Sequence, residues 1–600
     1  MNFSPSLFSY SRRNTREVTV GDPTHGGVVI GGANPVVKQS MLTCDTMDTA
    51  LSVRQTLELV AAGCQLVRIT APTVKDAANL KNIVSELRNQ GCFVPIVADI
   101  HFKPEAAMEA ALWVEKVRIN PGNYADSKKF AIKDYTDEQY HAELGRIEER
   151  FTPLVLLCQK LNRAMRIGTN HGSLSDRIMN RFGDTPLGMV ESALEFARIA
   201  RKNNYHNFVF SMKSSNPKVM IACYRLLVSR LNELGPDWNY PVHLGVTEAG
   251  EGEDGRIKSA IGIGSLLCDG IGDTIRVSLT EDSPREIAVC NDLLQQIPEL
   301  VNSGRNIEAL EPFNPYQFSR RESDTIQLTD DLKCGGTETV RVVVSRPVFD
   351  KVAPRIRVKD DVRPEAVYED LNVQEVDPTT EFSVGCDSQL ITVRDGVQLP
   401  VITAFRLLTS KLKGMGKRNP ILLKDCLSFP ASAYEPAIAL LRASVTIGAL
   451  LADGIGDAIL VRSETGAGQS LRLAFNILQA SGCRSFKTDY VACPSCGRTL
   501  FNLQTVTARI KERTQHLKGV KIAIMGCIVN GPGEMADADF GYVGGAPNKI
   551  NLYVGKTAVK FNIPEAEAVD RLVDLIREHH KWVEPEPAEF ASRVDALLTN

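Results

Sequence analysis

Val94-Pro-Ile-Val-Ala-Asp-Ile100, followed by Lys116-Val-Arg-Ile-Asn120, sets the fold expected for this chain. Both are short β-branched runs that include charged or polar residues near their ends, and a helical stretch separates them. Six more runs of this kind span residues 36–41, 65–70, 164–169, 207–213, 242–247 and 274–280. Eight strand–helix repeats in about 250 residues predict an N-terminal (β/α)8 TIM barrel within an α/β protein.

The predicted strands carry cations within them or at their ends. These are Arg68, Arg118, Arg166, Lys213 and Arg276. One such residue alone would more often form an ordinary surface ion pair. In a barrel, however, successive strand ends converge on one mouth. Five cations there predict a compact, multiply charged anion such as a diphosphate, because the arginine fork matches phosphate oxygens.

Other polar residues accompany these cations. They are Asp99, His101, Asn120, Asn170, Thr247, Glu248 and Ser278. Glu248 is either a loop acid or, among cations, an acid/base candidate. Taken alone, His101 is an ordinary capping or core histidine. We expect this set to supply substrate contacts and proton transfer.

A cysteine motif near the C-terminus predicts a metal centre. Its first part is Cys493-Pro-Ser-Cys496-Gly, and its second part, about thirty residues later, is Gly526-Cys527-Ile-Val-Asn-Gly-Pro-Gly-Glu534. The first pair alone favours a zinc knuckle. His516 or Cys483 would have to complete such a site, and neither has a typical spacing. An iron–sulfur cluster accepts three cysteines and an oxygen ligand.

The residues around Cys527 favour that second interpretation. Residues 520–525 are predicted to form a buried strand that delivers Cys527 at its end. The Gly/Pro-rich loop after it can aim Glu534 without disturbing a helix. Any single Glu is more commonly a solvated loop acid, and its place beside the third cysteine makes Glu534 a ligand candidate.

Composition narrows the class of protein. The 600 residues are 43% hydrophobic and 24% charged, with a net charge of −3, so no overall basic field favours nucleic acid or a membrane surface. The 14 cysteines are mostly isolated in apolar segments, as in a reducing compartment. We find no secretory signal and expect a cytoplasmic protein.

Residues 263–277 recur as residues 447–461, identical at 11 of 15 positions. The second copy has Leu460 where the first has Arg276, which suggests that packing was kept and anion binding lost. Strand-like runs at 339–345, 401–405, 421–424 and 458–462 predict an inserted, structural α/β domain related by partial duplication. A hairpin is expected over residues 549–560 and a helix over residues 566–582.

Several motifs together resemble one family. They are Val117-Arg-Ile-Asn-Pro-Gly-Asn123, Arg166-Ile-Gly-Thr-Asn-His-Gly-Ser173, Leu244-Gly-Val-Thr-Glu-Ala-Gly250, Ile275-Arg-Val-Ser278 and the two cysteine motifs. They look like those of the 4-hydroxy-3-methylbut-2-en-1-yl diphosphate synthases, iron–sulfur enzymes of non-mevalonate isoprenoid biosynthesis. The resemblance spans about residues 16–580 and is closest to the long, three-domain form.

The resemblance implies reductive ring opening of 2-C-methyl-D-erythritol 2,4-cyclodiphosphate, with two electrons from ferredoxin or flavodoxin. It implies one 4Fe-4S cluster on Cys493, Cys496, Cys527 and Glu534. It also implies a diphosphate held by barrel residues, namely Arg68, Arg118, Asn120, Arg166, Asn170, Lys213, Thr247, Arg276 and Ser278. Glu248 would donate a proton, with Asp99 and His101 as weaker candidates.

The expected units are a substrate-binding barrel (1–305), an inserted structural domain (306–482) and an iron–sulfur domain (483–600). We expect a homodimer, but the sequence leaves open whether the last unit closes over its own barrel or over a partner's. Two alternatives remain open at this point. One is a zinc-ribbon protein with metal-independent aldol or phosphate-ester chemistry in its barrel, and the other is a non-catalytic iron–sulfur carrier or sensor.

Overall fold

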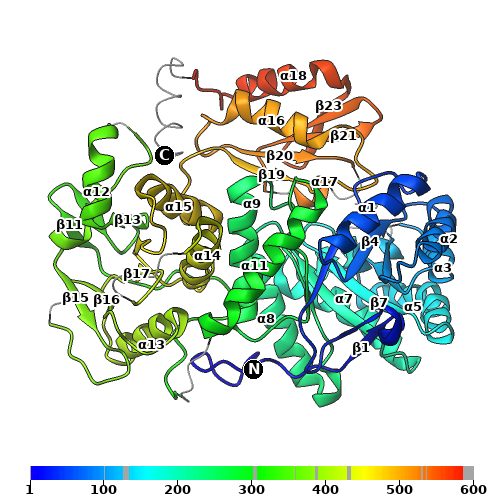
Figure 1. The fold of residues 1–600 in the computed structure, drawn as a ribbon, viewed down its shortest axis with the longest axis horizontal. Helices are drawn as coiled ribbons and strands as arrows, with labels where there is room; N and C mark the ends of the chain where they lie inside the picture. Colours follow the sequence, from blue (N-terminus) through cyan, green and yellow to red (C-terminus); the bar gives the residue numbers. More distant parts are fainter. Residues whose placement is uncertain are drawn as a thin grey trace.

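The structure is a computed structural model. It describes residues 2–100, 102–125, 134–301, 307–357, 360–385, 389–428, 434–528, 531–535 and 537–585. Figure 1 shows the barrel in blue to green, a second α/β unit in green to yellow, and an orange to red C-terminal unit that lies across both. No helix among these residues is long and apolar enough to cross a membrane.

The predicted barrel is confirmed, with all eight strands parallel and near their expected positions. The strands are β3 (Val37–Met41), β4 (Leu66–Thr70), β5 (Ile96–Asp99), β6 (Lys116–Ile119), β7 (Ala164–Asn170), β8 (Phe208–Lys213), β9 (His243–Leu244) and β10 (Thr274–Ile275). They pair in the order β8-β7-β6-β5-β4-β3-β10-β9. A parallel bridge between Phe210 and Val242 joins the two ends of this sheet and closes the barrel.

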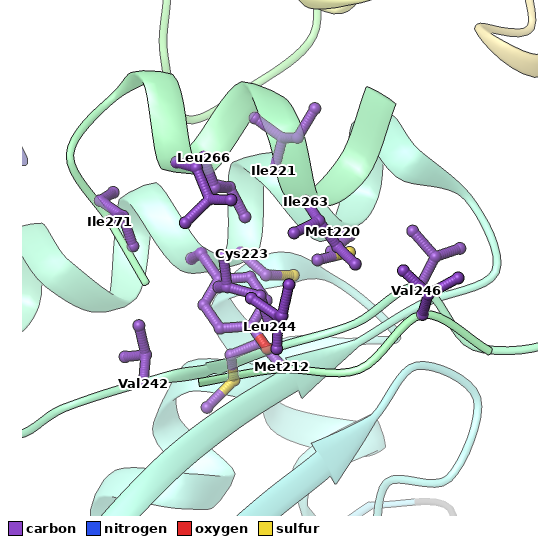
Figure 2. Packing of buried hydrophobic residues seen from close by; sticks show 14 of the residues in the cluster. Met212, Met220, Ile221, Cys223, Val242, Leu244, Val246, Ile263, Leu266 and Ile271 are labelled. Atoms are coloured by element: carbon purple, nitrogen blue, oxygen red, sulfur yellow. The ribbon is translucent and has the colours of Figure 1, made fainter. Parts of the chain in front are cut away.

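Helices cover the outside of the barrel. The longer ones are α1 (Thr49–Ala61), α2 (Val74–Asn89), α5 (Asp137–Lys160), α7 (Pro186–Lys202), α8 (Pro217–Leu234) and α11 (Ser283–Val301). Figure 2 shows one part of this packing, where Met220 of α8 and Ile263 and Leu266 of the next helical segment lie over Leu244 of β9. This apolar layer fixes the strands whose ends carry the polar side chains.

The amino-terminal end of the barrel is closed by a hairpin. Strands β1 (Val18–Val20) and β2 (Val28–Ile30) pair antiparallel. Their side chains form one buried cluster with residues at or near the beginnings of five barrel strands, namely Val37, Leu66, Val97, Ala164 and Val209. The hairpin therefore fills this end with apolar side chains, and the polar end of the barrel faces the opposite way.

The second unit contains another parallel sheet. Strands β14 (Ala366–Val367), β13 (Arg341–Val344), β18 (Ala458–Leu460) and β17 (Leu422–Lys424) pair in that order. A bridge from Ile421 to Ile391 connects them to β16 (Leu390–Val393), which pairs with β15 (Val373–Val376). The strands expected near residues 339–345, 421–424 and 458–462 are confirmed.

The strand expected at residues 401–405 is wrong. Helix α13 (Val401–Gly414) occupies this segment, directly after Pro400. Its buried residues include Phe405, Leu408 and Leu412, which follow helical spacing, so a five-residue apolar run was too short to distinguish the two states.

The two copies of the repeated segment adopt the same local structure and pack against each other. Each ends a helix, turns at a glycine with φ of +79° (Gly270 and Gly454), and enters a strand, β10 or β18. A Cβ atom on Gly264 would lie 2.4 Å from Val445, and one on Gly448 would lie 2.4 Å from Ile261. The matching contacts agree with the predicted partial duplication.

The C-terminal unit is a five-stranded mixed sheet with helices α16 (Leu503–Thr514) and α18 (Glu565–Glu578). The strands are β19 (Asp489–Ala492), β20 (Lys521–Met525), β21 (Phe540–Ala546), β22 (Lys549–Val554) and β23 (Thr557–Pro564), paired in chain order. The predicted hairpin and final helix are confirmed. Strands β19 and β20 deliver the two cysteine motifs at their carboxyl ends (Figure 1).

Candidate active site

A cavity of about 70 Å³ lies between the mouth of the barrel and the C-terminal unit. Its walls bring together residues that are hundreds of positions apart in the sequence. From the barrel come Arg68, Asp99, Arg118, Arg166, Asn170, Lys213, Thr247, Glu248, Arg276 and Ser278, and from the C-terminal unit come Cys493, Cys496, Cys527 and Glu534. Fourteen of the sixteen predicted site residues therefore line one cavity.

The C-terminal unit closes over the barrel of its own chain. Ala249, next to Glu248, forms a parallel bridge with Ala492, and the Thr280 hydroxyl donates to the Cys493 carbonyl at 3.1 Å. Lys258 pairs with Asp489 at 2.9 Å. These contacts fasten the first cysteine motif to the carboxyl ends of β9 and β10.

A glycine contact fastens the second cysteine motif. A Cβ atom on Gly172 would lie 2.0 Å from the carbonyl oxygen of Gly533, and one on Gly533 would lie 2.3 Å from that of Gly172. Real Cβ atoms do not approach so closely, and Gly172 also has a φ of +75° that favours glycine. The two backbones touch directly, which brings Glu534 against the barrel.

One carboxylate organises several of the arginines. Asp99 accepts from Arg118 Nη1 at 3.0 Å and lies 3.8 Å from Arg68 Nε. Arg118 also donates to the Asn170 side chain at 3.1 Å. Asp99 therefore serves as an ion-pair partner that holds the guanidinium groups in place.

The five predicted cations differ in how well they are neutralised. Glu286 accepts two hydrogen bonds of 3.0 Å from Arg276. Arg166 and Lys213, by contrast, have no carboxylate within ion-pair distance among the described residues, and Nε and Nη1 of Arg166 are buried there without a hydrogen-bond partner. Burial and the neighbouring cations lower the pKa of both groups. A bound anion would stabilise these two buried cations.

Two carboxyl groups, those of Glu248 and Glu534, lie close to each other in the cavity wall. The Thr247 hydroxyl donates to Glu248 at 3.0 Å, and the Asn170 side chain donates to Glu534. Burial, and then the nearby Glu534, raise the pKa of Glu248 well above its usual range. Glu248, in the loop that follows β9, also has a φ of +53°, a strained conformation for a residue with a side chain.

The three cysteines gather around the same space. The Gly526 amide donates to Cys493 Sγ at 3.2 Å. Burial, followed by the proximity of Glu248 and Cys496, raises the pKa of the Cys493 thiol. In the part of the chain that the structure describes, no three Cys, His, Asp or Glu side chains converge on a single metal-ion position.

Two predicted residues are not part of the cavity wall as described. Asn120 is buried directly after β6, where its side chain accepts from the Gly122 amide and caps α4 (Pro121–Tyr124). The structure thus gives Asn120 a capping role, and its substrate contact stays a prediction. His101 lies outside the described residues.

The loop expected before Glu534 is a single helical turn, α17 (Gly531–Glu534). A proline is tolerated in the first turn of a helix, so Pro532 does not oppose this conformation. Glu534 is thus presented by a short helix and is 6% exposed.

Sequence reasoning missed several residues of the site. Met41 and Arg498 line the cavity, and Glu286 lies behind Arg276. The sulfur of Met41 lies 3.0 Å from Arg68 and 3.1 Å from Arg276. Of these three residues, only Arg498 could have been found from the sequence, because it follows the first cysteine pair by two positions. Glu286 lies inside a helix, where an acidic residue is unremarkable.

Comparisons with known proteins agree with this geometry. Residues 15–291 match the model of the GcpE TIM-barrel domain, and residues 489–578 match that of the GcpE protein C-terminal domain. A 4-hydroxy-3-methylbut-2-en-1-yl diphosphate synthase (flavodoxin) of Akkermansia muciniphila is 56% identical, over 97% of this chain and 99% of its own length. The chain belongs to the GcpE family of 4-hydroxy-3-methylbut-2-en-1-yl diphosphate synthases.

Other members of this synthase family differ in the electron donor that their names give. A flavodoxin-type synthase of Leptospira interrogans is 45% identical, over 98% of this chain and all of its own length. A chloroplastic ferredoxin-type synthase of Oryza sativa is 40% identical, over 97% of this chain and 89% of its own. Among solved structures, the dihydropteroate synthase of Thermus thermophilus aligns with 48% of the chain and all of its own, at 16% identity and a TM-score of 0.32.

Proposed function

We propose that this chain converts 2-C-methyl-D-erythritol 2,4-cyclodiphosphate into 4-hydroxy-3-methylbut-2-enyl diphosphate by two-electron reduction, with loss of water. One observation carries the proposal. A single cavity joins cations of a barrel, two of them without a carboxylate in ion-pair distance among the described residues, to three thiols and a carboxylate of a second unit. Neither part alone has the groups for both anion binding and electron transfer. The activity also agrees with the names of the family members.

The donor set fits a 4Fe-4S cluster held by Cys493, Cys496, Cys527 and Glu534. Thiolates are the usual ligands of such clusters, which use one protein donor for each iron. In the described part of the chain, these donors line a cavity and do not converge on one point, whereas a tetrahedral zinc ion requires four convergent donors. Glu534 Oε2 is buried without a hydrogen-bond partner among the described residues, so it is available as a ligand. A cluster held by these residues would supply the electrons for the reduction.

The barrel cations would bind and activate the diphosphate. Arg166 and Lys213 have no carboxylate partner in the described residues, whereas Arg68 and Arg118 share Asp99. As the ring opens, the carbon–oxygen bond to the phosphate breaks and negative charge concentrates on that oxygen. Positioned cations in a site without bulk water stabilise this charge strongly. Asn170, Thr247, Arg276 and Ser278 would fix the orientation.

Glu248 is the proton donor in this proposal. It lies beside Glu534 in the cavity wall, and burial and then Glu534 raise its pKa well above the usual range, which favours the protonated form that a donor needs. It would protonate the hydroxyl oxygen that leaves as water. Asp99 is occupied by two arginines and is better suited to positioning them.

We further propose the three units 1–305, 306–482 and 483–600, with the middle unit structural. Flavodoxin or ferredoxin would serve as electron donor, in the cytoplasm. A homodimer remains our prediction, although the closed cavity uses residues of one chain only. Analytical ultracentrifugation of the loaded protein would check the oligomeric state.

The first experiment measures iron and sulfide in anaerobically purified protein, and then dithionite-driven turnover of the cyclic diphosphate in the same sample. We expect about four irons per chain, broad absorption near about 400 nm and product formation. Stoichiometric zinc without turnover would return the protein to the zinc-ribbon alternative. A loaded cluster without turnover or diphosphate binding would instead favour a carrier.

A further inference from the structure

Arg498 is a cation that the C-terminal unit brings to the barrel. It follows Cys496 by two positions and lines the cavity together with the barrel arginines. A tight turn holds this segment, because the Cys496 amide donates to the Thr499 hydroxyl at 3.0 Å and the Thr499 amide donates to the Cys496 carbonyl at 2.8 Å. The side chain is therefore presented by a constrained backbone.

Gly497 allows this turn to reach the barrel. A Cβ atom at this position would lie 2.5 Å from the carbonyl oxygen of Cys44 and 2.6 Å from the hydroxyl of Thr70, at the end of β4. Only a residue without a side chain fits so close to barrel backbone. The position of Arg498 in the mouth is thus a consequence of closure, and opening the C-terminal unit would withdraw it.

Six cations, Arg498 among them, line the cavity together with three carboxyl groups. Asp99 is the shared anionic neighbour of four guanidinium groups, those of Arg68, Arg118, Arg166 and Arg498. The charges of Arg68 and Arg498 also repel each other across the boundary between the two units. Cys496, Cys527 and Asp99 stabilise the charge of Arg498 itself, and an anion in the cavity would offset the remaining repulsion among the guanidinium groups.

We propose that Arg498 binds the diphosphate of the substrate from the side of the C-terminal unit, so that anion binding and closure favour each other. This inference rests on the proposed function. Cys496 and Cys527 also lie near Arg498. A guanidinium group has five N–H donors in a planar fork, so it can contact more than one group at a time.

The test measures the affinity of the iron-loaded protein for inorganic pyrophosphate by anaerobic titration calorimetry at constant salt. The variants are Arg498→Gln, Arg498→Lys and, as a matched control, Arg513→Gln. Arg513 lies on α16 of the same unit but pairs with Asp570 at the surface, with a half-exposed side chain. Its replacement removes the same charge from the same unit. Absorption spectra and iron content confirm loading of each sample.

We expect Arg498→Gln to weaken pyrophosphate binding by roughly ten- to a hundredfold, as loss of a charged hydrogen bond would. Arg498→Lys should fall between this variant and the wild type, and Arg513→Gln should bind like the wild type. Equal affinity of Arg498→Gln and wild type would overturn the inference. If Arg498→Gln loses iron, the loaded Arg498→Lys variant is used in its place. Wild-type affinity for pyrophosphate in Arg498→Lys would then also overturn the inference.

The outcome for the wild type separates this inference from the proposed function. A loaded, active wild type that binds pyrophosphate as tightly as Arg498→Gln would leave the synthase activity standing and remove only the role of Arg498. A loaded wild type without pyrophosphate affinity would overturn the diphosphate site itself, and the role of Arg498 with it.

Discussion

At the scale of single residues, the barrel mouth separates paired cations from unpaired ones. Arg276 is held by Glu286 and Arg118 by Asp99, whereas Lys213 is 5% exposed and has no carboxylate within ion-pair distance in the described segments. A buried cation without a counter-ion is costly to fold. Its presence is explained if the substrate supplies the missing negative charge.

Lys213→Ala should therefore weaken binding of the cyclic diphosphate by roughly ten- to a hundredfold, because one charged hydrogen bond is lost. The iron content should stay unchanged, since Lys213 lies on the barrel side of the cavity. Equilibrium binding and iron analysis of the same sample check both points. Lys202→Ala, which removes an exposed lysine paired with Glu148, serves as the control. Unchanged affinity in Lys213→Ala would favour the iron–sulfur carrier alternative.

At the scale of elements, the sequence predicted the barrel strands better than it predicted short or isolated segments. Alternation of β-branched runs and helices located all eight barrel strands, because each must be buried against helices. It did not identify α13 or α17, where a short apolar run and a Gly/Pro-rich segment are compatible with either a helix or another state. Asn120 shows a related ambiguity, since asparagine caps helices as readily as it binds ligands.

The turn at Gly172 gives a prediction for the closing contact. Gly172→Ala should lower kcat by more than tenfold with little loss of iron, because a side chain at this position would push Gly533 away from the barrel. Steady-state kinetics and iron content test this directly. Gly91→Ala is a matched control, since Gly91 has nearly the same φ of +74° and no neighbour within 4 Å of an added Cβ. Equal kcat for both variants would show that this contact does not limit closure.

At the scale of the whole molecule, a buried group of four charges joins the barrel to the second α/β unit. Arg225 and Arg406 each pair with both Asp269 and Asp453, at 2.7–3.0 Å. The two aspartates occupy equivalent positions of the repeated segment. Every side chain in the group is at most 5% exposed, so each charge depends on the other three.

Arg406→Ala should lower the free energy of unfolding by about 3–5 kcal/mol, because it leaves two buried carboxylates with one cation. Urea unfolding followed by circular dichroism measures the change. Arg418→Ala is the control. Its side chain is 54% exposed and pairs with Asp324, so its loss should cost less than about 1 kcal/mol. A similarly small cost for Arg406→Ala would mean that this group does not hold the two units together.

The sequence by itself determined the barrel, the cations of its mouth and the cysteine motifs, because each depends on a local pattern or on a spacing along the chain. Only the tertiary structure decided how the parts meet. Closure onto the chain's own barrel, the burial of Arg166 without a partner among the described residues, the use of Asp99 as an ion-pair partner and the entry of Arg498 into the mouth all depend on contacts between distant segments. Such contacts result from packing and electrostatics in three dimensions, which no local pattern encodes.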